Sequence, residues 1–148
     1  MRAPLLKLPG WHKRWLYTSF TVLAATGLAW LLLHYGREAD TLPPPAEAWL
    51  LRVHGLASMF VLMGLGMVAG SHVPAGWRLS AQAGRLGQRR SGLWLSAVLT
   101  AVVLTAYGLL YLVPEAWHEA TGWVHAGLAL SLALLWAWHR PRRHRPGA

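Results

Sequence analysis

Histidines placed inside apolar stretches are the residues of this chain best suited to chemistry. Five of its eight histidines lie within or at the ends of such stretches. Two pairs stand out, His54 with His72 at a spacing of 18 residues and His125 with His139 at a spacing of 14; the fifth is His34. On helices these spacings keep each pair close to one face, with about 27 Å and about 21 Å of rise between its members. Imidazole is costly in lipid, so such histidines are candidate ligands or interhelical hydrogen-bonding groups.

The ligand chemistry available narrows the choice of bound group. The chain has no cysteine, which excludes thiolate-bound clusters and covalent c-type haem. A bare metal ion usually takes more protein ligands, and no acidic residue lies at these depths. Haem iron needs two axial ligands from the protein, so paired imidazoles fit b-type haem. We therefore expect two haems, one held by His54 and His125 and the other by His139 with His72.

Four apolar blocks must position these histidines. They cover residues of about 15–34, 49–72, 93–113 and 117–138, and each is long enough to cross a bilayer as a helix. Backbone groups in lipid must be satisfied within their own segment, which favours helices. The sequence predicts an all-α membrane protein, a single integral domain over 1–148 built as a four-transmembrane-helix up-down bundle, with a long loop at 73–91 and a basic tail at 140–148.

Charge predicts the topology. Twelve of the 14 basic residues fall before the first block, between the second and third, or after the fourth, whereas all five acidic residues lie in the other connections or their flanks. By the positive-inside rule both termini are cytoplasmic. The second and fourth helices then run in the same direction, which brings His54 level with His125 and His72 level with His139. The twelve are Arg2, Lys7, Lys13, Arg14, Arg78, Arg85, Arg89, Arg90, Arg140, Arg142, Arg143 and Arg145.

The net charge of +9 has two interpretations, nucleic-acid binding and contact with anionic lipid. The basic residues flank apolar helices and form no soluble basic module, so we expect membrane lipid and no nucleic acid as partner. No acid–base or nucleophile constellation is present. An electron-transfer protein or oxidoreductase subunit is therefore expected rather than a stand-alone enzyme.

Other polar residues are candidates for roles beside the haems. His12 begins the first helix on the cytoplasmic side and competes with His72 for the inner haem. His34 ends that helix on the outer side, where it would approach a haem propionate or a quinone. Arg37 and Arg52 are candidate partners of the propionates. For Arg52, extension toward the lipid headgroups is an equally good interpretation.

The chain resembles the four-helix di-haem cytochrome b membrane proteins, including the cytochrome subunits of respiratory formate dehydrogenases and nickel–iron hydrogenases. The resemblance lies in the 14-residue spacing of His125 and His139 and in the segments 51–55 (LRVHG), 104–108 (LTAYG) and 123–125 (WVH), which also look like small uncharacterised bacterial relatives. It implies an outer haem held by His54 and His125 and an inner haem held by His139 with His12. His72 shares a face with His54, so the inner partner is open between His72 and His12.

From these observations we expect a di-haem b-type cytochrome of the bacterial inner membrane. It would carry electrons across the bilayer between a quinone or quinol pool and a redox protein partner. The alternative is a haem-free four-helix scaffold or assembly subunit whose histidines make interhelical hydrogen bonds.

Overall fold

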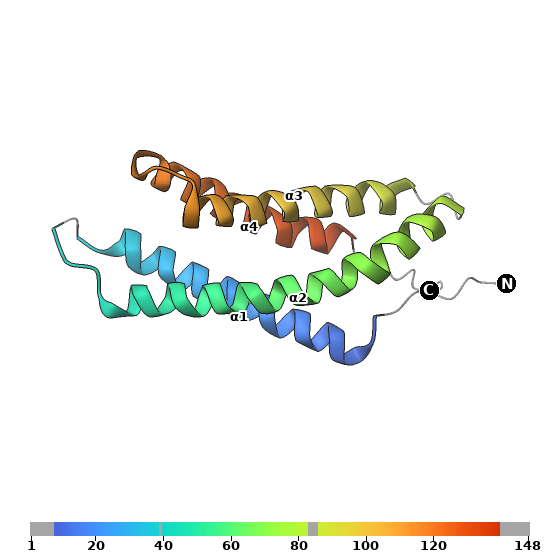
Figure 1. Ribbon diagram of the computed structural model, residues 1–148, viewed down its shortest axis with the longest axis horizontal. Coiled ribbons are helices and arrows are strands. Elements are labelled where there is room, and N and C mark those ends of the chain that lie inside the picture. The colour runs from blue at the N-terminus through green and yellow to red at the C-terminus, as the bar shows by residue number, and fades with distance from the viewer. Residues whose placement is uncertain (1–7, 39, 83–85, 140–148) are drawn as a thin grey trace, which may run out of the picture. The chain divides into compact units, whose positions relative to one another are not determined.

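Four helices make up the described part of the chain. The structure, a computed structural model, describes residues 8–38, 40–82 and 86–139. The secondary-structure elements of these residues are all helices, which confirms the all-α prediction for them. All four helices are long and apolar enough to cross a membrane. They are α1 (Gly10–Gly36), α2 (Pro45–Gln82), α3 (Leu86–Tyr111) and α4 (Glu115–His139) (Figure 1). The predicted basic tail at 140–148 lies outside the described residues.

The helix ends differ from the predicted bounds, most of all in α2. The expected long loop at 73–91 is wrong, because α2 continues to Gln82 and α3 begins at Leu86. Hydropathy marks where a helix can cross lipid, whereas local backbone bonding lets the helix continue into polar surroundings. Pro74 lies inside α2. Proline removes one backbone bond and crowds the carbonyl four residues earlier, here that of Gly70, yet the helix continues to Gln82. His72 consequently lies within the helix.

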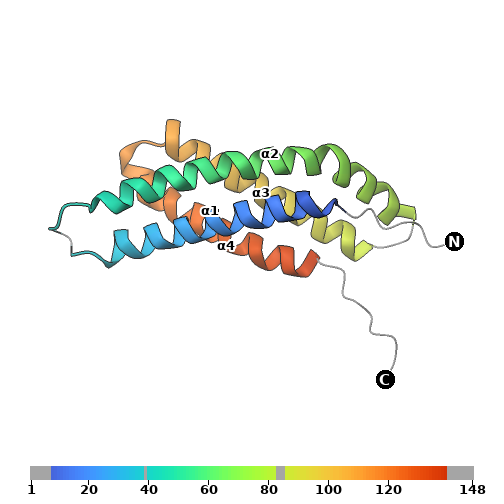
Figure 2. The ribbon, with the colours of Figure 1, turned by 90° about the horizontal axis from the view of Figure 1, so that it is seen from below.

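The first compact unit extends to Arg78 and contains α1 and most of α2. The two helices run side by side in opposite directions in both ribbon views (Figures 1 and 2). Side-chain bonds fix this register: the Trp15 indole donates to the Phe60 carbonyl at 3.0 Å near one end of the pair, and His34 meets Glu47 at the other. The predicted up-down connection is confirmed within this unit.

Small residues on α2 let α1 approach closely. Ala57, Val61 and Gly64 follow one another at helical spacing and are buried. A Cβ added at Gly64 would meet Leu16 Cδ2 at 2.6 Å and Trp15 Cδ1 at 3.2 Å. Close packing at small residues is how helices associate where the surrounding lipid removes the hydrophobic driving force.

The second compact unit begins at Leu79 and contains α3 and α4. A tight turn joins them, with the backbone amides of Leu112 and Val113 both donating to the Gly108 carbonyl. Side-chain bonds again show an antiparallel register. Along α4, residues 118, 125 and 139 bond in turn to residues 109, 105 and 91 of α3. The up-down connection is confirmed within this unit as well.

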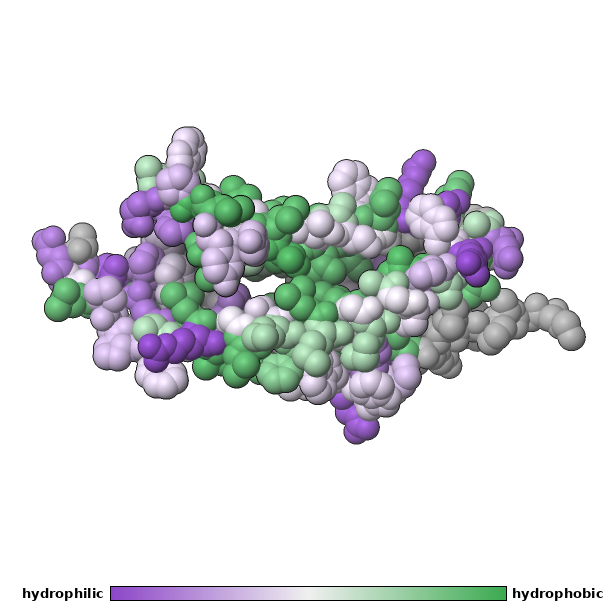
Figure 3. Space-filling view, in the orientation of Figure 1, coloured by the Kyte–Doolittle hydropathy of each residue, from purple (hydrophilic) through white to green (hydrophobic). Residues whose placement is uncertain are grey.

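Most large apolar side chains of both units are exposed. Among the described residues the buried hydrophobic side chains are Ala57 and Val61, while leucines such as Leu32, Leu110 and Leu134 are more than half exposed. Figure 3 shows hydrophobic residues along the middle of the helices and hydrophilic residues gathered toward their ends. A water-soluble protein rarely exposes so much apolar surface, whereas lipid-facing helices do.

Candidate functional site

His54 is held by α1 through one nitrogen of its ring. Its Nδ1 lies 2.9 Å from the Leu23 carbonyl oxygen and 3.2 Å from Thr26 Oγ1. A carbonyl oxygen only accepts, so we assign the ring proton to Nδ1, which donates to Leu23. A Cβ at Gly27 would meet the His54 ring at 3.0 Å, so this glycine gives the imidazole its space. The nitrogen that carries the lone pair is then Nε2.

His125 repeats this arrangement in the second unit. Its Nδ1 lies 2.9 Å from Thr105 Oγ1 on α3. The Thr105 hydroxyl donates to the Ala101 carbonyl at 2.9 Å, so it accepts from Nδ1–H of His125. Thr26 likewise donates to a carbonyl one turn earlier, that of Val22 at 2.8 Å. In each unit the first helix thus orients a histidine of the second through Nδ1, by the Leu23 carbonyl at His54 and by the Thr105 hydroxyl at His125, which assigns the lone pair to Nε2.

His139, at the end of α4, is also oriented through Nδ1. This nitrogen lies 2.9 Å from Ser91 Oγ near the start of α3. Ser91 is only 2% exposed, and a Cβ at the adjacent Gly92 would touch the His139 ring at 3.4 Å. A hydroxyl and a glycine therefore fit the imidazole, as threonine and glycine do at His54.

His12 and His72, the two candidates for the inner haem, have different surroundings. His12 is 4% exposed, and its Nε2 donates to the Gly64 carbonyl at 3.0 Å. This bond engages Nε2, so Nδ1 is the nitrogen that would have to ligate a haem. The His72 Nδ1 is buried and has no hydrogen-bond partner in the described part of the chain. Pairing either residue with His139, or His54 with His125, joins histidines of different units and stays a prediction.

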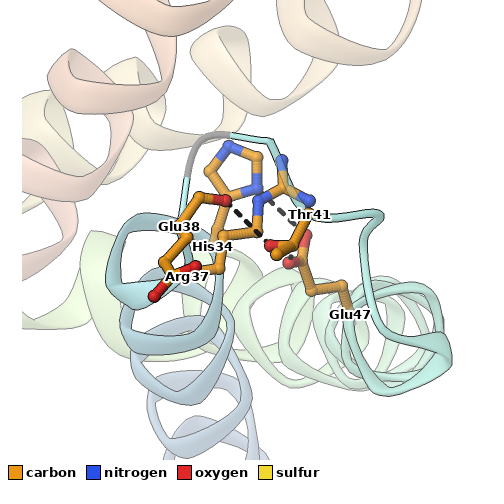
Figure 4. A network of polar contacts seen from close by, with 5 residues as sticks. All are labelled: His34, Arg37, Glu38, Thr41 and Glu47. Carbon is orange, nitrogen blue, oxygen red and sulfur yellow. Dashed lines mark hydrogen bonds and ion pairs between the residues drawn. The ribbon is translucent and has the colours of Figure 1, made fainter.

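The remaining predicted residues lie near the loop between α1 and α2. His34 Nδ1 is 3.0 Å from Glu47 Oε2, and Arg37 Nη1 is 3.6 Å from Glu47 Oε1 (Figure 4). Arg37, predicted to meet a propionate, is thus paired with a carboxylate of the protein. The Arg52 guanidinium lies over the Trp49 ring at 4.9 Å, a cation–π contact typical of an interfacial arginine.

Four of the residues in these contacts were not candidates from sequence. Three are hydroxyl residues. Each lies on a neighbouring helix at the level of a histidine, so only the antiparallel register of the two helices could have identified it from sequence. The fourth is acidic, and the sequence predicts for it only a charge on the outer side. They are Thr26, Ser91, Thr105 and Glu47.

The donor set favours a group that needs few protein ligands. Within residues 8–38, 40–82 and 86–139 no three histidine or acidic side chains come together as a metal centre would require. Haem needs only axial ligands, and an imidazole that donates Nδ1–H to a hydroxyl or carbonyl and presents Nε2 is the usual form of such a ligand. His54 and His125 fit this requirement.

No protein family model, curated protein or solved structure matches the chain.

Proposed function

We propose that this protein is a di-haem b-type cytochrome that carries electrons across a membrane between a quinone or quinol pool and a redox protein partner. The observation that supports it best is the repeated arrangement at His54 and His125. Each histidine lies in a helix suited to crossing a membrane, and each is oriented through Nδ1 by the partner helix. Two such ligands at one depth are what a membrane-embedded haem requires.

Four histidines would ligate the two haems. His54 and His125 would hold the outer one, and His139 with His72 or His12 would hold the inner one. Haem iron supplies the one-electron chemistry when bound. The protein would orient the imidazoles, exclude water through its apolar helices, and hold a proton at Nδ1 of His54 and His125. Donation from Nδ1–H makes Nε2 a better donor to iron.

The proposed setting is the bacterial inner membrane with both termini in the cytoplasm. The basic residues before the first span, between the second and third, and after the fourth support this orientation by the positive-inside rule. His34 and the loop between α1 and α2 then lie on the outer side. His12, His72 and His139 lie toward the cytoplasm.

A haem-free scaffold is the second candidate, and a specific observation favours it. His54, His125 and His139 each bond across their own helix pair, to Leu23, Thr105 and Ser91 respectively. Such bonds contribute to helix association without any cofactor, by about 0.6 kcal/mol each in membranes. The two candidates differ in whether removing a histidine removes a bound group or only weakens the helix pair.

Substitution of the proposed ligands tests the function. His54→Ala and His125→Ala should each remove one of two haems, as measured by pyridine haemochrome titration of purified protein. Because both ligands serve one haem, the double variant should keep the same remaining haem as either single variant. The matched control is His118→Ala on the same face of α4, where His118 bonds to the Leu109 carbonyl at 2.8 Å. Unchanged haem in both single variants would refute the assignment.

The inner ligand is settled by the same titration. Of His12→Ala and His72→Ala, only the variant that lacks the true ligand should lose the inner haem.

A further inference from the structure

Unsatisfied polar atoms gather at the loop between α1 and α2. The described residues contain four buried side-chain nitrogen or oxygen atoms without a hydrogen-bond partner. Three belong to one cluster: Trp30 Nε1, Arg37 Nη1 and Glu47 Oε1. His34 joins them, since its ring stacks on Trp30 with centroids 4.4 Å apart and bonds to the other Glu47 oxygen. Buried polar atoms without partners are costly, so their concentration here indicates a place for another polar group.

The geometry of the cluster specifies the kind of group. Glu47 is nearly buried, with 8% of its side chain exposed, and its Oε2 accepts the His34 Nδ1–H bond at 3.0 Å. Oε1 lies 3.6 Å from Arg37 Nη1, too far for a good hydrogen bond. Although the two groups form an ion pair, Oε1 lacks a hydrogen-bond donor and Nη1 lacks a hydrogen-bond acceptor. A hydroxyl satisfies both, because it donates and accepts at once.

The surroundings favour a hydroxyl on a flat, apolar ring. The stacked Trp30 and His34 rings provide an aromatic surface, and Tyr35 meets the His34 ring edge-on at 4.9 Å. The His34 and Arg37 side chains are 31% and 26% exposed, while Arg37 Nη1 and Glu47 Oε1 are themselves buried, so a ligand reaches these two atoms by displacing the exposed parts of His34 and Arg37. In Figure 4 the His34 and Arg37 side chains both reach toward the Glu47 carboxylate. The cluster lies where membrane-crossing α1 ends, within reach of a lipid-soluble molecule.

We propose that His34, Arg37 and Glu47 bind the hydroxyl of a hydroquinone, an inference that rests on the proposed exchange with a quinol pool. The hydroxyl donates to Glu47 Oε1 and accepts from Arg37 Nη1. The oxidised quinone has only carbonyl oxygens, so it can accept from Arg37 but cannot donate to Glu47. The cluster therefore selects the reduced form and assigns the quinol site to the loop between α1 and α2.

The first test varies the ligand and leaves the protein unchanged. Purified full-length protein is titrated anaerobically, by calorimetry in detergent, with a decyl-substituted benzohydroquinone, its quinone, and its dimethyl ether. The hydroquinone should bind at least about tenfold more tightly than the quinone, because donation to a carboxylate is worth more than an ordinary hydrogen bond. The ether, which cannot donate, should bind no better than the quinone. Equal binding of all three, as expected if water alone fills the cluster, overturns the proposal.

The second test varies the protein. Glu47→Gln keeps the shape and removes the charge, so hydroquinone affinity should fall about tenfold. Glu38→Gln is the matched control: Glu38 is exposed in the same loop, and its contact with Thr41 is through the backbone carbonyl. Equal loss in both variants, or loss in neither, overturns the proposal. If Glu47→Gln does not fold, the ligand series on the natural protein decides.

Neither titration depends on haem, so the two proposals fail separately. A haem-loaded protein that does not distinguish hydroquinone from quinone overturns only the binding site. A colourless protein that binds hydroquinone selectively overturns only the electron-carrier function.

Discussion

Gly27 on α1 makes room for the ring of His54, the proposed haem ligand on α2. Replacing Gly27 with alanine tests this contact. A Cβ at Gly27 would meet His54 Cε1 at 3.0 Å and Nδ1 at 3.3 Å, and the ring is already held by Leu23. A Cβ at Gly66 would meet nothing within 4 Å, so Gly66→Ala is the matched control. Alanine gains about 1 kcal/mol over glycine in a helix at either position. Overpacking against His54 costs about 1–3 kcal/mol at position 27 only.

The two variants should therefore differ in stability by about 1–3 kcal/mol. Gly66→Ala should raise the free energy of unfolding by up to about 1 kcal/mol. Gly27→Ala should leave it unchanged or lower it by up to about 2 kcal/mol, the overpacking cost less the helix gain. Both are measured by loss of helical circular dichroism during titration of the purified protein with sodium dodecyl sulfate. If Gly27→Ala is stabilised as much as Gly66→Ala, the contact with His54 is refuted.

Two further predictions concern packing and the second threonine. Gly64→Ala should leave the stability unchanged or lower it by up to about 2 kcal/mol, the overpacking cost less the helix gain, because its Cβ would meet a leucine side chain of α1 at 2.6 Å; the same titration checks this, and stabilisation would contradict the close approach. Thr105→Val removes the hydroxyl that orients His125, so it should shift the midpoint potential of the outer haem in a redox titration. Thr100→Val is the control, since its hydroxyl bonds only within α3, and equal shifts in both variants would exclude an orienting role for Thr105.

Apolar block length was sufficient to predict four helices and their antiparallel connection within each unit. It was not sufficient to locate the helix ends. The α2 helix extends ten residues beyond the predicted end at His72, through Pro74, because hydropathy falls where a helix leaves lipid and not where its backbone bonding stops. For the same reason the sequence predicts His72 at the edge of a loop, whereas it lies within α2.

The candidate histidines were identifiable from type and spacing, whereas their partners were not. A bond such as that of His125 to Thr105 depends on the register between α3 and α4, and a shift of one residue would rotate the threonine by about 100° around its helix. Glu47 was unpredictable for a related reason. Its burial arises from the positions of His34 and Arg37 across the loop, which the apolar pattern does not specify.

The haem content of the purified natural protein tests the central claim most directly. Protein is extracted from membranes with a mild detergent, quantified by amino-acid analysis, and measured by pyridine haemochrome assay and by the reduced-minus-oxidised visible spectrum. The proposed function predicts two b-type haems per chain, both low-spin because each iron has two histidine ligands. A folded helical protein that contains no haem would contradict it and favour the scaffold.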